Sequence, residues 1–134
     1  MPIKVAWDNQ QPLTLRYTYE GAWTWDEYLP CLNQGRDLMA TTDEMVCIIN
    51  DMRAVTKIPP NFISKAHNVI GSRPANTGLA LFLTEDKSFQ VLYTLLCRLM
   101  PSVDANYILT INEAQAYRRL EKWRAEQTND SENV

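Results

Sequence analysis

Hydrophobic and polar residues alternate near the start of the chain, which is the pattern of a half-buried β-strand. Residues 13–20, LTLRYTYE, alternate without interruption, and the apolar stretch IKVAW occupies residues 3–7. Between them, Asp8, Asn9 and Gln10 form a polar turn. The pattern therefore predicts an antiparallel hairpin at the start of the fold.

Two later stretches are almost continuously apolar, as expected for strands that are covered on both faces. They are MVCIIN at residues 45–50 and GLALFL at residues 78–83. A last strand is predicted at residues 107–111, YILTI. These stretches are short and rich in branched and aromatic residues, which favours strands over helices.

Helical spacing of the apolar residues fills the segments between and after the strands. The predicted helices span residues 25–40, 62–71, 86–100 and 113–125. Thr24 and Glu27 have the spacing of a capping box at the start of the first helix, and Pro30 is expected to bend it. The inward face of this helix is predicted to consist of Trp25, Leu29, Leu32 and Met39.

The predicted element order is β-β-α-β-α-β-α-β-α. Strands that alternate with helices need right-handed crossovers, which places them in a largely parallel sheet. We therefore expect a single α/β domain over residues 1–125, in which the antiparallel hairpin forms one edge of the sheet. Residues 126–134, EQTNDSENV, are predicted to be a disordered polar tail.

Composition narrows the function classes. The chain has 134 residues and a net charge of −3, and hydrophobic residues make up 46 % of it. Without a Lys/Arg cluster, binding to nucleic acid or to anionic lipid by charge is not expected. No apolar run has membrane-spanning length, and no signal peptide is recognisable, so a cytoplasmic protein that does not insert into membranes is predicted.

The cysteine and histidine content argues against disulfides and metals. Cys31, Cys47 and Cys97 are widely spaced, and His67 is the only histidine. This set does not match zinc-site spacing. Free, mostly buried thiols are expected, with no metal and no cofactor.

The segment VCIINDMRAVTKIPPNF, residues 46–62, together with the element order, resembles the STAS superfamily, the anti-sigma-factor antagonist or SpoIIAA-like domains. The resemblance covers residues 3–124 and rests on pattern and length. It implies a STAS-like fold and a non-catalytic, regulatory, protein-binding role. In that superfamily a buried strand ends in an aspartate, here matched by Asp51, and an Asp-Ser-x-Gly loop with a phosphorylated serine opens the next helix.

The loop departs from this pattern. Pro59 and Pro60 stand where the family has Asp and Ser, followed by Asn61 and Phe62. Proline cannot accept a phosphate, so the family's switch is not expected here. The chain is more similar to STAS-like domains that lack the serine and that overlap structurally with the CRAL-TRIO lipid carriers.

Four polar residues around this loop are candidates for contact with a partner or ligand. Asp51 and Arg53 follow a buried strand, where α/β sheets commonly bind ligands, although pairing with each other is the favoured interpretation. Lys57 and Asn61 flank the prolines. A solvated loop is favoured for them, and a partner contact is the alternative.

Aromatic residues cluster at the start of the first helix. Trp23 and Trp25 flank Thr24, and Tyr17 and Tyr19 precede them on the second strand. Such residues usually belong to the core, and that interpretation is favoured. The alternative is that they line a cavity for an apolar ligand.

The third predicted helix is apolar over about 240° of its circumference, more than one sheet face requires. Phe89, Leu92 and Leu96 are assigned to the sheet. The remaining apolar flank, Val91, Leu95 and Leu99, must be covered by self-association or by a bound ligand, and a homodimer surface is the prediction made here.

Catalysis has no positive support. Ser64 and His67 lie three residues apart on one predicted helix after Asp51, but the sequence lacks the sharp elbow that presents a nucleophile. The predicted function is a non-catalytic protein-interaction module with an unidentified protein partner. The alternative is a small carrier or sensor for a lipid or other apolar ligand.

Overall fold

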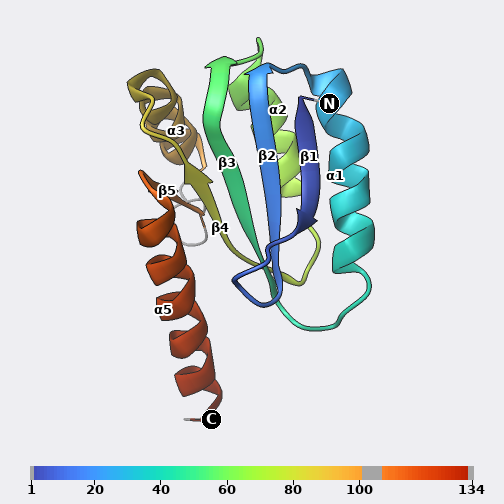
Figure 1. The fold of residues 1–134 in the computed structure, drawn as a ribbon, viewed down its shortest axis with the longest axis vertical. Helices are drawn as coiled ribbons and strands as arrows, with labels where there is room; N and C mark the ends of the chain where they lie inside the picture. The colour runs from blue at the N-terminus through green and yellow to red at the C-terminus, as the bar shows by residue number, and fades with distance from the viewer. Residues whose placement is uncertain (1, 101–106, 133–134) are drawn as a thin grey trace.

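The computed structural model describes residues 2–100 and 107–132. One sheet holds five strands in the order β1-β2-β3-β4-β5 (Figure 1). The strands are β1 (Ile3–Trp7), β2 (Thr14–Ala22), β3 (Val46–Lys57), β4 (Thr77–Leu83) and β5 (Tyr107–Thr110). The helices are α1 (Trp25–Met39), α2 (Phe62–Gly71), α3 (Lys87–Leu99) and α5 (Glu113–Glu132). The α/β class and the element order confirm the predicted fold class.

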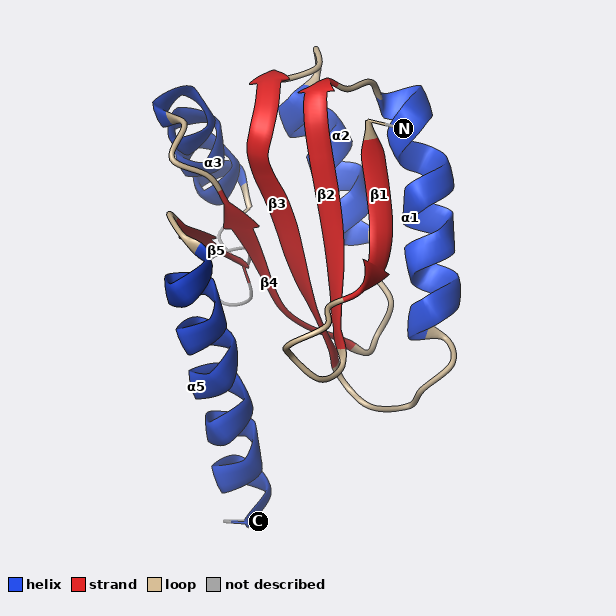
Figure 2. Cartoon of the chain, viewed as in Figure 1, coloured by secondary structure: helices blue, strands red, loops and turns tan. Residues whose placement is uncertain are grey.

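The sheet is antiparallel at one edge and parallel elsewhere. β1 pairs with β2 in the predicted hairpin, with Val5 opposite Tyr17. The pairs β2–β3, β3–β4 and β4–β5 are all parallel. Figure 2 shows the hairpin beside α1 and the β4–β5 edge beside α5.

The two faces of the sheet are covered unequally. Side chains from α1, α2 and α3 pack in one large core against one face. The smaller core on the other face contains Ala116 and Leu120 of α5, packed against β3 and β4. Because β3 contributes Val46 to the first core and Cys47 to the second, its apolar run is continuous, as predicted.

Helix α1 begins with the predicted capping box. The Thr24 hydroxyl accepts a hydrogen bond from the Glu27 amide, and the Glu27 carboxylate accepts one from the Thr24 amide. The predicted inward face is partly wrong, because Leu29 is 51 % exposed. The buried stripe is instead Tyr28, Cys31, Gly35 and Met39, whose spacing of three and four residues follows the helical repeat.

Strand β3 is longer than predicted, so Asp51 does not end a strand. β3 continues to Lys57 because β2 itself extends to Ala22 and keeps pairing with it, through register shifts beside Glu20. Met52 is also buried, at 4 % exposure, which holds this part of the strand against the core. The strand-end aspartate expected from the STAS resemblance is therefore a mid-strand residue.

The two prolines connect β3 to α2 without entering the helix. Asn61 follows them as the N-cap in a left-handed conformation, φ 60°, and helix α2 begins at Phe62. The Trp25 indole donates a hydrogen bond of 2.9 Å to the Pro60 carbonyl oxygen. The loop is thus tied to the start of α1.

Helix α5 is capped by Asn112, whose side chain accepts a hydrogen bond from the Gln115 amide. The helix continues to Glu132. Most of the segment that the sequence analysis assigns to a polar tail, from residue 126, is therefore the end of α5, and residues 133–134 lie outside the described residues. The domain boundary at residue 125 stays a prediction.

The cysteines form no disulfide bond with one another in the described part of the chain. Cys31 and Cys47 are buried, Cys97 is half-buried, and all three are free thiols. Among the described helices, none combines the length and the apolar character needed to cross a membrane.

The Tyr17 side chain of β2 packs directly against Gly35 of helix α1. A Cβ atom at this position would overlap the Tyr17 hydroxyl and lie 2.8 Å from Tyr17 Cζ. We therefore predict that Gly35→Ala lowers the free energy of unfolding by about 1–3 kcal/mol in urea, despite the higher helix propensity of alanine.

Two variants make this test specific. Gly71→Ala, where an added Cβ meets nothing within 4 Å, should not destabilise the protein. Adding Tyr17→Phe to Gly35→Ala should restore part of the loss by removing the overlapping oxygen. Equal stability of wild type and Gly35→Ala would contradict the close packing.

Candidate functional site

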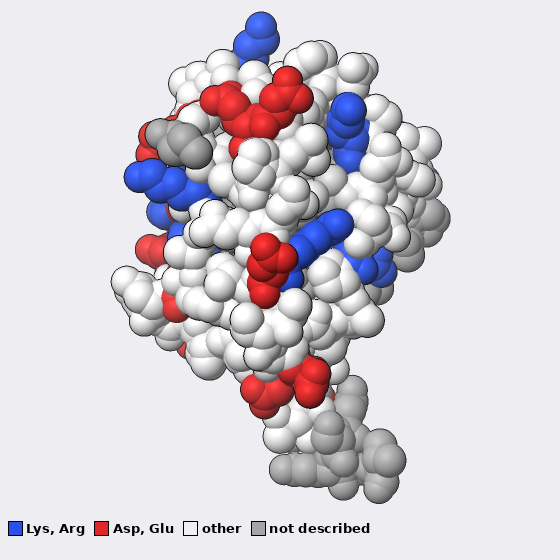
Figure 3. Space-filling model, turned by 90° about the vertical axis from the view of Figure 1, so that its right-hand side faces the viewer, with Lys and Arg blue, Asp and Glu red and all other residues white. Residues whose placement is uncertain are grey.

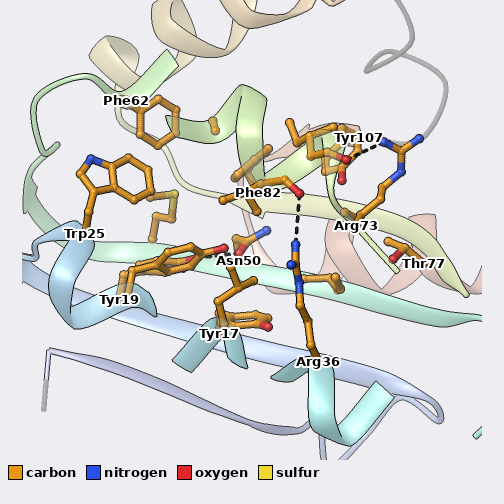
Figure 4. Close-up of a pocket in the computed structure, with 18 of the residues that line it drawn as sticks. Tyr17, Tyr19, Trp25, Arg36, Asn50, Phe62, Arg73, Thr77, Phe82 and Tyr107 are labelled. Carbon is orange, nitrogen blue, oxygen red and sulfur yellow. Dashed lines mark hydrogen bonds between the residues drawn. The ribbon is translucent and has the colours of Figure 1, made fainter. Parts of the chain in front are cut away.

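A partly enclosed cavity of about 90 Å³ lies between the sheet and helices α1 and α2 (Figure 4). Its walls come from β2, β3, β4, β5, both helices and the loops that flank them. The aromatic residues that line it are Tyr17, Tyr19, Trp23, Trp25, Tyr28, Phe62, Phe82 and Tyr107. The charged residues that line it are Arg36 and Arg73, with no acidic residue among them.

The aromatic wall is held together by ring-to-ring contacts. The Trp23 ring lies 5.0 Å from the rings of both Tyr19 and Trp25, measured between centroids. Tyr17 and Tyr19 are 3 % and 4 % exposed. These residues are therefore core residues, as the favoured interpretation states, and they also form a cavity wall; the apolar ligand stays a prediction.

The tyrosine hydroxyls of the wall are neutral at ordinary pH. Burial raises the pKa of Tyr17 to about 12, although the nearby positive charge of Arg36 acts in the opposite direction. Burial likewise raises the pKa of Tyr19 and Tyr28. The Tyr19 hydroxyl donates a 2.8 Å hydrogen bond to Asn50 Oδ1. The side-chain oxygen of Asn50 on β3 is therefore already hydrogen-bonded within the protein.

Arg36 lies at one end of the cavity, opposite the end formed by Trp25 and Phe62 (Figure 4). One terminal nitrogen donates to the Val69 carbonyl at 3.3 Å and to the Ser72 hydroxyl at 3.1 Å. Its Nε is buried and has no hydrogen-bond partner in the structure. Leaving a buried donor unsatisfied costs about 1–3 kcal/mol. Because Arg36 Nε is closed to solvent, a ligand in the cavity could bond to it only after the arginine side chain shifts.

Arg73 lies at the same end as Arg36. It is exposed, and its Nη1 donates a 2.7 Å hydrogen bond to the Ile70 carbonyl. Burial raises the pKa of Tyr107, and the positive charges of Arg73 and Arg36 both oppose this shift. Among the described residues, neither arginine forms an ion pair, so this end of the cavity is positively charged.

A second charged cluster occupies the other face of the sheet. Arg16 of β2 binds Asp8 at 2.9 Å, Asp51 at 2.9 Å and Glu113 at 2.6 Å. An open groove of about 450 Å³ lies beside this cluster. The charges are paired with one another, which makes the cluster a connection between the hairpin, β3 and α5.

Asp51 and Arg53 bind each other, as the favoured interpretation states. The Asp51 carboxylate accepts hydrogen bonds from the Arg53 amide and from Nε and Nη2 of Arg53, and one also from Arg16. Its oxygens are therefore occupied by protein donors. A partner or ligand would have to displace these bonds to reach it.

Lys57 and Asn61 are exposed and lie away from Asp51. Lys57 ends β3 and lines an open hollow of about 390 Å³ with Pro59 and Pro60. Asn61 begins α2 on the cavity face, whereas the Asp51 carboxylate lies on the α5 face with Arg16 and Glu113. The four predicted contact residues therefore do not form one site.

The residues considered for catalysis are also separated, because Asp51 lies far from Ser64 of α2. The Ser64 hydroxyl donates to the Asn61 carbonyl at 3.1 Å, while the Asp51 carboxylate lies on the other face of the sheet. Across residues 2–100 and 107–132, no group of His, Cys, Asp and Glu side chains is arranged to hold a metal ion.

The flank of α3 is exposed where the sequence analysis places the homodimer surface. Val91, Leu95 and Leu99 are 61 %, 40 % and 66 % exposed, whereas Phe89 and Leu96 are each 1 % exposed against the sheet. On the side of the molecule that Figure 3 shows, several acidic side chains gather near the top of the view, and the basic ones are scattered among uncharged residues.

Sequence reasoning missed both cavity arginines. Arg36 is in the last turn of α1, where a basic residue commonly balances the helix dipole, and Arg73 is in a loop. No periodicity distinguishes them from surface arginines. Only the packing of α2 beside α1 brings them to one cavity.

Comparison of the chain with protein-family models, with curated proteins and with solved structures gives no match. The STAS resemblance therefore stays a prediction, and the function is argued from the site alone.

The Arg16 cluster predicts loss of stability in acid. Burial alone would raise the pKa of Asp51 and Asp8, but hydrogen bonds and positive charge from the arginines outweigh it and lower both values. An aspartate with a lowered pKa stabilises the fold above its unfolded pKa of about 3.9, and this stabilisation is lost as the pH falls through the folded value. We predict that the free energy of unfolding falls from about pH 4 downward.

Asp51→Asn separates the contribution of this residue. The variant should be less stable at pH 7 and should lose less further stability in acid, as measured by urea unfolding at several pH values. Asp37→Asn, at an exposed position on α1, is the control. If the free energy of unfolding of Asp51→Asn falls with pH as steeply as that of wild type, the ion pairs of Asp51 do not cause the loss of stability in acid.

Proposed function

We propose that this protein binds a small, mostly apolar molecule in the aromatic cavity and acts as a non-catalytic carrier or sensor. The observation that carries the proposal is the combination of a partly enclosed aromatic wall with two arginines, Arg36 and Arg73, that form no ion pair among the described residues. Ligand sites are typically apolar hollows that contain a few polar groups to orient the ligand.

The cavity volume limits the size of the ligand. About 90 Å³ is smaller than the roughly 150 Å³ cavity that holds benzene in an engineered protein. The cavity is open at one side, so part of a ligand can remain outside. A molecule with an apolar part of only a few carbon atoms therefore fits better than a long lipid chain.

A cavity-filling variant tests this proposal. Ala66 of α2 lines the cavity, so Ala66→Met should fill part of it, keep the helix and weaken binding of 1-pentanol at least tenfold. Binding is followed by tryptophan fluorescence, because Trp23 and Trp25 line the same cavity. Ala114→Met, at an exposed position on α5, is the matched control.

Wild-type protein that binds neither pentanol nor pentanoate would contradict the proposal. Unchanged binding in Ala66→Met would place the ligand elsewhere. Native mass spectrometry of protein purified from cells adds a second measurement, in which a retained small molecule is expected.

A protein-interaction function is the second candidate, and the exposed row on α3 favours it. Val91, Leu95 and Leu99 are four residues apart, so they lie along one side of the helix and form a surface that a second copy of the chain could match by two-fold symmetry. We predict a homodimer in wild-type protein. Leu95→Glu should then give a folded monomer, because the charge would meet its own copy across the axis.

Size-exclusion chromatography with light scattering measures the oligomeric state, and circular dichroism shows whether the variant is folded. Thr94→Glu, at the neighbouring exposed position, should stay dimeric. A monomeric wild type would show that the dimer prediction is wrong. Unfolding of Leu95→Glu would place Leu95 in the core instead.

A further inference from the structure

We infer that the ligand of the aromatic cavity is a small monocarboxylic acid whose carboxylate binds Arg36 and Arg73. This inference rests on the proposed function and adds the chemical class of the ligand. Three features of the cavity support this ligand class: the positive charge at one end, the guanidinium donors at that end, and the apolar space behind the arginines.

The charge at the cavity end selects an anion. Arg36 and Arg73 are the charged residues of the lining, and both carry a positive charge. The carboxylates of Asp8, Asp51 and Glu113 are bound to Arg16 on the opposite face of the sheet and do not neutralise them. A cationic ligand would therefore be repelled, although an aromatic wall alone would suit one.

The unused donors select a carboxylate among anions. Arg36 has one terminal nitrogen bonded to Val69 and Ser72 and leaves Nε buried without a partner. The planar fork of Nε and the adjacent terminal nitrogen matches the two oxygens of a carboxylate, which would replace the bonds of that nitrogen to Val69 and Ser72. A phosphate monoester would bring almost a second charge to a partly buried site, which adds desolvation cost.

The space behind the arginines selects a short apolar chain. The cavity continues from Arg36 and Arg73 between Tyr17 and Phe82 towards the Trp25 end (Figure 4). With about 90 Å³ available, a chain of a few carbon atoms fills it. The acid is therefore expected to place its carboxylate at the arginines and its chain among the rings.

The test compares pentanoate with 1-pentanol and pentylamine, which share the chain and differ in the head group. In wild-type protein we expect pentanoate to bind at least tenfold more tightly than pentanol and pentylamine to bind least. Among straight-chain acids of three to ten carbons, affinity should reach its maximum at a short chain and fall for longer ones. Titration calorimetry and tryptophan fluorescence measure the dissociation constants.

Arginine variants locate the carboxylate. Arg36→Met keeps an apolar side chain and removes the charge, so the preference for pentanoate over pentanol should fall at least fivefold. Arg36→Lys keeps the charge without the fork and should retain an intermediate preference. Arg73→Gln should reduce the preference without removing pentanol binding, and Arg118→Met, at an exposed position on α5, should leave it unchanged.

Each outcome distinguishes this inference from the proposed function. Equal binding of pentanoate and pentanol by wild type would overturn the carboxylate assignment and leave the cavity as a site for neutral molecules. Binding of neither would overturn both. If Arg36→Met does not fold, the test rests on Arg73→Gln and Arg36→Lys. If both of these variants prefer pentanoate over pentanol as strongly as wild type does, the inference is overturned.

Discussion

The contact between the Tyr17 side chain of β2 and Gly35 of helix α1 shapes the cavity face. Because Gly35 has no side chain, the Tyr17 hydroxyl reaches under the helix. The next residue, Arg36, then reaches the last turn of α2 and hydrogen-bonds to Val69 and Ser72. The same contact therefore positions the aromatic wall and the cationic end, which are the two parts of the proposed site.

The two faces of the sheet use arginine in opposite ways. Arg16 forms ion pairs with Asp8, Asp51 and Glu113, and these pairs connect the hairpin, β3 and α5. Arg36 is bonded to neutral oxygens and keeps a buried N–H group without a partner. A paired arginine supports the fold, whereas an arginine without a counter-charge beside a cavity is a reason to expect an anionic ligand.

Much of the fold could be predicted from the sequence, because strand alternation, buried runs and the Thr24–Glu27 capping box are local signals. The errors arose where a distant contact decides the outcome. The sequence predicts Asp51 at a strand end, but β2 extends to Ala22 and keeps pairing with β3, so Asp51 lies in the middle of the strand. Arg36 and Arg73 could not be identified as site residues, since only the packing of α1 and α2 brings them to one cavity. The aromatic cluster was recognised as a candidate because its four residues are close in the sequence.

The central claim is that a small acid enters the cavity with its carboxylate at the arginines. Isotope-filtered nuclear Overhauser spectroscopy with ¹³C-labelled pentanoate tests this most directly. The account predicts contacts from the terminal methyl group to ring protons of Tyr17, Tyr19 and Phe82, and from the carbon next to the carboxylate to the side chain of Arg36. Contacts confined to the exposed Val91, Leu95 and Leu99 row of α3, with none to these rings, would contradict it.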